Sequence, residues 1–390
     1  MTNLVPPHGA GTLKPLLLPE KLRAQELSRA EELKKLPMTS CEGCDLLLLS
    51  MGAKTHLDGF MGEEDWRGVC QDMKLTDGVF WPIPITVSAA QALADQIEIG
   101  EDVALLDGET QQIMAILTVE DKYSPDLTLQ CEKVFGPADE SHPGVAKVMA
   151  QPPVNLGGSV KVIEEGWFPS EFSELYIRPD EGRKMFEDMG WSKIAAFQTR
   201  NPMHRSHAYL VKIAIDVTDG VFIHQVLGKL KPGDIPAPVR VEAINAMIDN
   251  YFKDNIAVQA GYPIEMRYAG PREALFHALI RQNFGCSHLI VGRDHAGVGD
   301  FYGPFDAHDI FDTLWDGALV TQPLKIDITF YCEKCDGMAT DKTCPHDEEF
   351  RIQVSGTRQR EMLTNGEDIS TKFSRPEVVA VLRKYYENMN

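Results

Sequence analysis

The sequence is short of basic residues and of long apolar runs. Its 390 residues include 38 Lys and Arg against 58 Asp and Glu, which gives a formal net charge of −20. A negative field of this size repels a phosphate backbone, so we expect no nucleic-acid partner. No run of 18 apolar residues occurs, and no basic segment precedes the short leucine run at residues 16–18. We therefore expect a cytoplasmic protein with no membrane partner.

Cysteine is also scarce. Eight cysteines in a chain of this length are too few for a disulfide framework. Three of them stand alone and are expected to be small core residues: Cys70, Cys131 and Cys286. Cys41 and Cys44 have CxxC spacing without a second pair nearby, so we expect a plain turn there, with a redox role as the alternative.

The other CxxC pair belongs to a denser cluster. The pattern Cys332-x2-Cys335-x8-Cys344-x-His346 places three thiols and one imidazole within 15 residues. This ligand set suits tetrahedral zinc and leaves no open coordination position, so we expect a structural zinc that holds the C-terminal segment in place. The alternative is a thiol-rich loop without metal.

The rest of the composition is typical of a folded protein of two or three domains. Hydrophobic residues make up 43% of the chain, too many for a disordered one. The negative charge is unevenly distributed, because residues 198–300 hold 11 Lys and Arg against 10 Asp and Glu, together with six of the 11 histidines. An anion can therefore approach this segment without meeting the average repulsion.

The first third of the chain is typical of a β-rich domain. Leucines spaced through a charged segment predict a surface helix at residues 20–36. Strands are expected at residues 79–87 and, as a hairpin with an Asp-Gly turn, at residues 103–106 and 111–119. Prolines and glycines make residues 136–158 turn-rich, and we expect this domain to close there or to lead into its last strands.

From about residue 171, short apolar strands alternate with helices. The expected strands are residues 194–197, 221–226, 264–268 and 288–291. The expected helices are residues 203–215, 239–251 and 271–284, the first with Asn201 as its N-cap and Pro202 at its first position. Such alternation implies a parallel, doubly wound sheet, which binds ligands beyond the carboxyl ends of its strands where the strand order reverses.

Polar loops follow two of these strands. Residues 198–201 bring a glutamine and an arginine to a helix N-terminus, an anion-binding position. His204 and His207 are three residues apart, so both imidazoles are expected to donate hydrogen bonds to one polyphosphate; the alternative is a capped helix with two surface histidines. Residues 292–299 contain three glycines and further donors. Residues 354–358 offer two hydroxyls and a guanidinium, or simply a capped helix start.

These motifs resemble those of the ATP sulfurylase (sulfate adenylyltransferase) family. The matching segments are QTRNPMHRSH at residues 198–207, GPREA at 270–274 and GRDHAG at 292–297. The resemblance continues through residues 57–61, 231–236, 355–357 and 373–377. It implies an α/β multi-domain protein: a PUA-like β-rich domain at 1–170, a nucleotidyltransferase domain with a Rossmann-like parallel sheet at 171–330, and a small C-terminal α/β domain with the zinc loop at 331–390.

The resemblance also implies a reaction. A sulfate oxygen would attack the α-phosphorus of ATP in line, giving adenylyl sulfate and pyrophosphate, with Mg²⁺ arriving on ATP. Sulfate would bind Gln198, Arg200 and the Ala296 backbone. The catalytic residues would be Thr199, Arg200, Asn201, His204 and His207, the histidines stabilising charge on the leaving group. ATP would bind Gln198, Thr199, Arg200, Asn201, Gly292, Arg293, Asp294 and His295. The reverse reaction, ATP synthesis, is also feasible, because the phosphosulfate anhydride is higher in energy than the bond it replaces. A homo-oligomer is expected, a dimer being favoured.

Two departures and two alternatives accompany the resemblance. Residues 225–229 read QVLGK where the family has His-Pro, which affects substrate contacts there. The phosphate-binding pattern GxxxxGK[ST] is absent, so we expect no kinase activity and an unphosphorylated product. The alternatives are a transferase that adenylylates a phosphate-bearing acceptor, which the β-rich N-terminal region disfavours, and a non-catalytic nucleotide-binding module, which the intact polar set disfavours.

Overall fold

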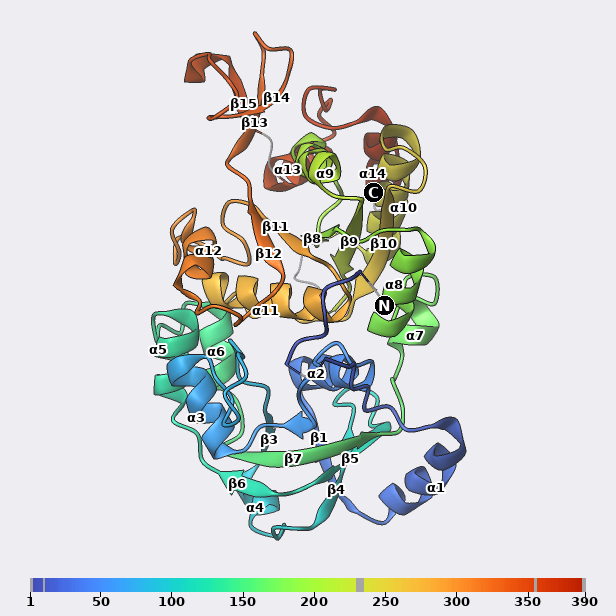
Figure 1. The fold of residues 1–390 in the computed structure, drawn as a ribbon, viewed down its shortest axis with the longest axis vertical. Helices are drawn as coiled ribbons and strands as arrows, with labels where there is room; N and C mark the ends of the chain where they lie inside the picture. The colour runs from blue at the N-terminus through green and yellow to red at the C-terminus, as the bar shows by residue number, and fades with distance from the viewer. Residues whose placement is uncertain (1–2, 10, 229–234, 354–355, 388–390) are drawn as a thin grey trace.

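The computed structural model describes residues 3–9, 11–228, 235–353 and 356–387. Figure 1 shows three parts along the long axis of the molecule: a β-rich part at one end, a parallel sheet with its helices in the middle, and a small three-stranded sheet at the far end. None of the helices within the described ranges is long and apolar enough to cross a membrane.

The β-rich part is built around one long strand. β7 (Val154–Val162) pairs antiparallel with four shorter strands: β2 (Gly59–Phe60), β3 (Val87–Ala89), β5 (Ile113–Thr118) and β6 (Asp121–Tyr123). The sheet continues through β4 (Asp102–Leu106) to β1 (Lys34–Pro37), and β4 and β5 form the expected hairpin. The helices of this part are α1 (Glu20–Glu31), α2 (Ser40–Ser50), α3 (Glu63–Asp72), α4 (Gln91–Ala94), α5 (Leu127–Phe135) and α6 (Pro143–Met149).

Three expectations for this part were wrong in detail, and one was confirmed. The helix expected at residues 20–36 stops at Glu31, because residues 34–37 pair with β4 instead. The strand expected at 79–87 is reduced to β3, since Pro82 and Pro84 cannot donate to a strand ladder. The turn-rich stretch at 136–158 leads, as expected, into the last strand of this part, β7, and it also contains α6 with Pro143 at its first position. Cys41 and Cys44 lie in helix α2 rather than in a turn.

The middle part is a five-stranded parallel sheet in the order β10-β9-β8-β11-β12. Its strands are β8 (Ile194–Thr199), β9 (Gly220–Val226), β10 (Ala257–Tyr262), β11 (His288–Val291) and β12 (Gln322–Lys325). All seven residues of β9 are buried, as parallel strands covered on both faces require. The strand order reverses between β8 and β11, so the carboxyl ends of these two strands diverge and leave a crevice.

Helices cover both faces of this sheet. They are α7 (Phe168–Glu171), α8 (Pro179–Asp188), α9 (Arg205–Val217), α10 (Ala237–Tyr251), α11 (Gly270–Asn283) and the short α12 (Asp306–Asp309). In Figure 1, α11 runs between the parallel sheet and the β-rich part. Twelve of its 14 residues are buried, which is typical of a helix packed on all sides. One apolar cluster accordingly joins Leu156 of β7 to Phe276 of α11.

Two expected elements of the middle part were misplaced. The strand expected at residues 264–268 is a loop, because the partner of β9 is β10, six or seven residues earlier, and Pro263 follows it. The helix expected to begin at Pro202 begins at Arg205, with His204 as N-cap in place of Asn201. The backbone N–H of Asn201 instead donates to Thr199 Oγ1 at 3.1 Å, which closes a tight turn before the helix.

The C-terminal part has two components. β13 (Thr329–Cys332) pairs antiparallel with β14 (Gly337–Thr340) and with β15 (Arg351–Gln353), forming the small sheet at the end of the molecule in Figure 1. Helices α13 (Gly356–Thr364) and α14 (Pro376–Glu387) follow, and Val378 and Leu382 of α14 pack into the core beside α10.

Candidate active site

A cavity of about 350 Å³ lies at the point where the strand order reverses. The loops after β8 and β11 both line it, as the sequence predicts. Of the expected site residues, those lining the cavity are Gln198, Thr199, Arg200, Asn201, His207, Gly292, Arg293, Asp294, His295 and Ala296. His204 does not line it. Of the segments expected at 231–236 and 354–358, residues 231–234 and 354–355 lie outside the described residues, and α13 begins at Gly356.

The loop after β8 places Arg200 at the cavity wall. Nη1 of Arg200 donates a hydrogen bond to the Tyr268 hydroxyl at 2.6 Å, and its guanidinium lies 5.4 Å from the centre of the Tyr268 ring. The Arg200 carbonyl accepts a hydrogen bond at 3.0 Å from Arg240, a buried residue of α10. Both the backbone and the side chain of Arg200 are therefore held before any anion binds.

His204 and His207 stack on each other at the start of α9. Their ring centres are 3.8 Å apart with an 18° angle between planes, and Nδ1 of His204 accepts the backbone N–H of His207. Burial lowers the pKa of His207 to about 4 and that of His204 well below its usual value. Both rings are consequently neutral at pH 7. The His207 ring lines the cavity, where a ligand can approach it.

Burial also gives a prediction for acid stability. Eight histidines have pKa values that burial lowers: His8, His142, His204, His207, His224, His277, His288 and His295. In the unfolded chain they titrate near pH 6.5, so the unfolded state binds more protons as the pH falls from 6.5 toward 4. Each neutral histidine then removes up to about 1.4 kcal/mol of unfolding free energy per pH unit. We expect urea midpoints to drop steeply below pH 6.5, and His207→Gln to flatten that dependence. A midpoint constant from pH 7 to 5 would contradict it.

The loop after β11 has an unusual backbone. Asp294 and Ala296 have positive φ angles of 52° and 58°, and the Ala296 carbonyl accepts a hydrogen bond from the Gly270 N–H at 3.1 Å. Non-glycine residues at positive φ are strained, and such strain concentrates at binding sites. Asp294 donates its N–H to the Pro304 carbonyl at 2.9 Å, which ties the loop to the segment that follows it.

A buried polar group lies behind the cavity. His277 of α11 has Nδ1 3.2 Å from His295 Nε2 and Nε2 3.4 Å from the Gln198 amide nitrogen. Glu273, one turn earlier on the same helix, is fully buried and lies 3.6 Å from His277. Burial, with His277 and Arg281 nearby, lowers the pKa of His295 to about 3, so its imidazole is neutral.

The sequence analysis did not assign roles to Tyr268, His277 or Arg240. A sequence signal for His277 was available. It follows Glu273 of the GPREA segment by four residues, and residues i and i+4 lie on one face of a helix. Tyr268 and Arg240 reach the site only through the tertiary fold, since they lie 68 and 40 residues from Arg200.

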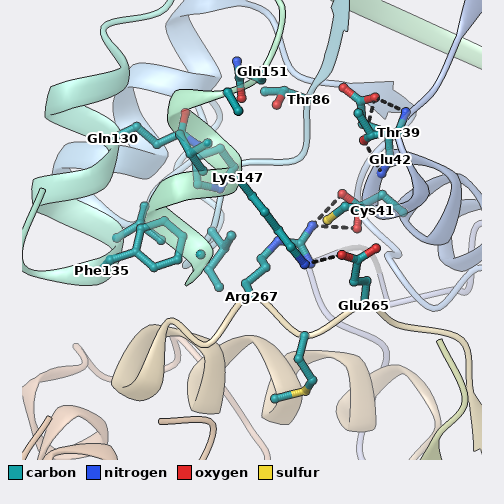
Figure 2. Close-up of a pocket in the computed structure, with 18 of the residues that line it drawn as sticks. Thr39, Cys41, Glu42, Thr86, Gln130, Phe135, Lys147, Gln151, Glu265 and Arg267 are labelled. Carbon is teal, nitrogen blue, oxygen red and sulfur yellow. Dashed lines mark hydrogen bonds and ion pairs between the residues drawn. The ribbon is translucent and has the colours of Figure 1, made fainter. Parts of the chain in front are cut away.

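A second cavity of about 330 Å³ lies between the β-rich part and α11. Figure 2 shows Glu265 and Arg267 extending into it from the loop before α11. Lys147 pairs with Glu265, and Arg267 donates two hydrogen bonds to the Asp45 carboxylate. Burial alone would raise the pKa of Asp45, but Arg267 and Lys54 outweigh it and lower the pKa. This cavity holds no expected site residue; its ion pairs join the two parts of the molecule.

The cysteine cluster forms a compact ligand set at one end of the small sheet. The candidate ligand atoms of Cys332, Cys335, Cys344 and His346 lie within 4.8 Å of one another. Sγ of Cys335 is 3.8 Å from Sγ of Cys344 and 3.3 Å from His346 Nδ1. Tetrahedral zinc with Zn–S bonds of about 2.3 Å requires sulfur pairs about 3.8 Å apart. The cluster therefore fits a metal such as zinc, away from the cavity. As expected, Cys70, Cys131 and Cys286 are free and buried.

Comparison with known proteins gives a consistent result. A family model described as ATP-sulfurylase matches residues 173–385, and one described as PUA-like domain matches residues 5–165. The β-rich part is thus PUA-like and the parallel sheet belongs to the sulfurylase domain. A solved structure titled "Hexameric APS kinase from Thiobacillus denitrificans" has a TM-score of 0.75 at 26% identity, over 98% of this chain and 68% of that one.

Relatives named sulfate adenylyltransferase are similar along almost their whole length. One from Pelodictyon phaeoclathratiforme is 60% identical over 99% of this chain and 96% of its own. One from Thiobacillus denitrificans is 56% identical over 100% of this chain and 96% of its own. Neither a transferase acting on another acceptor nor a non-catalytic module is favoured by these matches. With a family model over more than half of its length and relatives this similar from end to end, the chain belongs to the ATP sulfurylase family.

Proposed function

We propose that the chain is a sulfate adenylyltransferase that works by direct in-line transfer. A sulfate oxygen attacks the α-phosphorus of ATP, the new S–O–P bridge forms, and the α–β P–O bond breaks with its electron pair on the departing pyrophosphate. The observation that carries this proposal is the cavity where the strand order reverses, because it brings together Gln198, Arg200 and Ala296 from two separated segments. The relatives' shared name supports the reaction.

The residue roles follow from their positions in the cavity. Gln198, Arg200 and the Ala296 backbone hold sulfate, and Thr199 and Asn201 grip the phosphates. Gly292, Arg293, Asp294 and His295 seat the nucleotide. Positioning and electrostatics carry the rate, since no side chain becomes covalently attached. Mg²⁺ enters on the ATP phosphates and neutralises part of their charge.

The remaining features complete the proposal. The proposed domains are residues 1–170, 171–330 and 331–390, each with one sheet, except that β13 begins two residues before the last boundary. The metal at Cys332, Cys335, Cys344 and His346 is zinc with a structural role, because four protein ligands leave no position for substrate. The proposed location is the cytoplasm, because free thiols persist in a reducing compartment and the proposed substrate is ATP. We also propose a homo-oligomer, a dimer being favoured.

One assay tests the proposed function directly. Purified protein supplied with adenylyl sulfate, pyrophosphate and Mg²⁺ should form ATP, which luciferase luminescence measures. Omission of adenylyl sulfate is the control for contaminating ATP. A folded protein that makes no ATP in the complete mixture would remove the proposal.

His204 and His207 are proposed to act on the transition state. As a neutral ring, His207 donates a hydrogen bond to charge that grows on the leaving pyrophosphate, and His204, which does not line the cavity, supports it through the stacked ring. His207→Ala or His204→Ala should lower kcat about ten- to hundredfold, with a smaller change in KM for ATP. His288→Ala is the matched control, because His288 lies at the amino end of the same sheet and should leave kcat unchanged. A change in KM alone would make the pair binding residues.

A further inference from the structure

Two of the proposed sulfate ligands are held by one short turn. Tyr268 accepts a hydrogen bond from Arg200 Nη1 at 2.6 Å. Two residues later, the Gly270 N–H donates to the Ala296 carbonyl at 3.1 Å. Arg200 follows β8 and Ala296 follows β11, so residues 268–270 are a common contact for both walls of the cavity.

The backbone of this turn is strained. Tyr268 has φ +61° and Gly270 has φ +47°, and a bulky aromatic residue rarely adopts the left-handed region. A Cβ atom at Gly270 would lie 2.7 Å from the ring of Tyr302, so glycine is required there for space as well as for φ. Strain of this kind persists only where surrounding contacts over-determine the conformation.

Those contacts are present on three sides. The buried carboxylate of Glu273 accepts the N–H groups of Arg267 and Ala269, both at 2.9 Å, and so brackets Tyr268. From the β-rich part, Nδ1 of His142 accepts the Gly144 N–H, so the proton is on Nε2, which donates to the Tyr268 carbonyl at 3.0 Å.

The third set of contacts lies at the second cavity, between the β-rich part and α11. The loop before α11 contributes to both cavities: Glu265 and Arg267 reach into the cavity of Figure 2, and Tyr268 lines the cavity that holds Arg200. Arg267 donates to Asp45 of α2 at 2.7 Å. The β-rich part thus fixes the turn through both Asp45 and His142.

We propose that Tyr268 is a positioning residue of the sulfate subsite, which acts by holding the Arg200 guanidinium in its sulfate-binding orientation. This inference rests on the proposed function. An arginine side chain loses much rotamer freedom when it binds an anion. In the free enzyme the hydrogen bond to Tyr268 already restricts the Arg200 side chain, so less conformational entropy is lost when sulfate binds. The phenol contacts Arg200 rather than reacting atoms, and its effect should be specific to sulfate.

Tyr268→Phe tests the inference, because it removes only the hydroxyl and keeps the ring beneath the guanidinium. We expect kcat/KM for sulfate to fall about tenfold, the range for a lost hydrogen bond to a charged group. KM for ATP should change less than twofold. The assay runs in the forward direction with pyrophosphatase, and phosphate release is measured against each substrate in turn.

Tyr123→Phe is the matched control. Tyr123 is also a buried tyrosine, and its hydroxyl donates to the Met61 carbonyl at 3.1 Å in the β-rich part. It should lower the melting temperature at least as much as Tyr268→Phe and leave both KM values unchanged. Equal losses for ATP and sulfate in Tyr268→Phe would indicate a merely structural role and overturn the inference.

Calorimetric titration with sulfate, in the presence of a non-hydrolysable ATP analogue, separates this inference from the proposed function. If the parent binds sulfate about tenfold more tightly than Tyr268→Phe, the positioning role stands even where turnover is absent. If parent and variant bind sulfate equally, or neither binds it, the positioning role is wrong whatever the assay of ATP formation shows.

Discussion

Arg200→Ala should reduce kcat by about 10²–10³-fold, the loss typical of removing one preorganised donor from an anionic transition state. The guanidinium lines the cavity and is held by Tyr268 before any ligand binds, so water cannot reproduce its geometry. ATP formation from adenylyl sulfate and pyrophosphate measures the effect.

The fold should survive this substitution, because the Arg200 carbonyl, rather than its side chain, is bound by Arg240. Arg178→Ala is a suitable control: Arg178 pairs with Glu165, is half-buried to a similar degree, and does not line the cavity. Arg200→Lys keeps the positive charge but removes the planar pair of guanidinium N–H donors. Its kcat should lie between those of the parent and Arg200→Ala. An Arg200→Ala enzyme within a few-fold of the parent would refute the role assigned to Arg200.

Removal of the metal should have the second large effect. Purified tag-free protein should contain one zinc per chain, and Cys335→Ser should lose it together with the structure of residues 332–346. We expect amide exchange in this segment to accelerate at least about a hundredfold, because metal binding supplies most of the folding free energy of such small sites. Elemental analysis and exchange measured by mass spectrometry give the two readouts.

Catalysis should change far less than stability. The four ligands do not line the cavity, although Tyr331 beside Cys332 stacks over Arg205 at the start of α9. We therefore expect a folded, zinc-free enzyme to keep kcat within about threefold. Cys286→Ser, which removes a buried thiol elsewhere, should keep its zinc. A hundredfold loss of kcat without zinc would mean that the metal participates in the chemistry.

The sequence predicted those elements whose signal is local. Strand β11 and helix α11 have the expected bounds to within one residue, because an apolar run and a Pro-to-Gly helix pattern mark them directly. The segment at residues 264–268 looked like a strand because its apolar residues alternate with charged ones between turn residues. The backbone N–H groups of Arg267 and of Ala269 just after it donate to Glu273 instead of to a neighbouring strand, which no local pattern predicts.

The start of α9 illustrates the same limit within the site. Asn201 and Pro202 form a good N-cap pair in sequence, yet the helix begins at Arg205, because Thr199 turns the chain and His204 caps the helix with its ring. The two histidines, expected to donate together to a polyphosphate, stack on each other, and burial keeps both rings neutral. Burial is a property of packing, so their protonation state followed only from the structure.

By itself, the sequence determined the class of fold, the two polar loops and the composition of the metal cluster, because these depend on residue type and spacing along the chain. The tertiary structure decided how the ligands are held. Tyr268, Glu273 and His142 meet around one strained turn only because β10, α11 and the β-rich part pack together. Contacts between residues distant in sequence cost chain entropy that only the packed fold repays, so no local pattern encodes them.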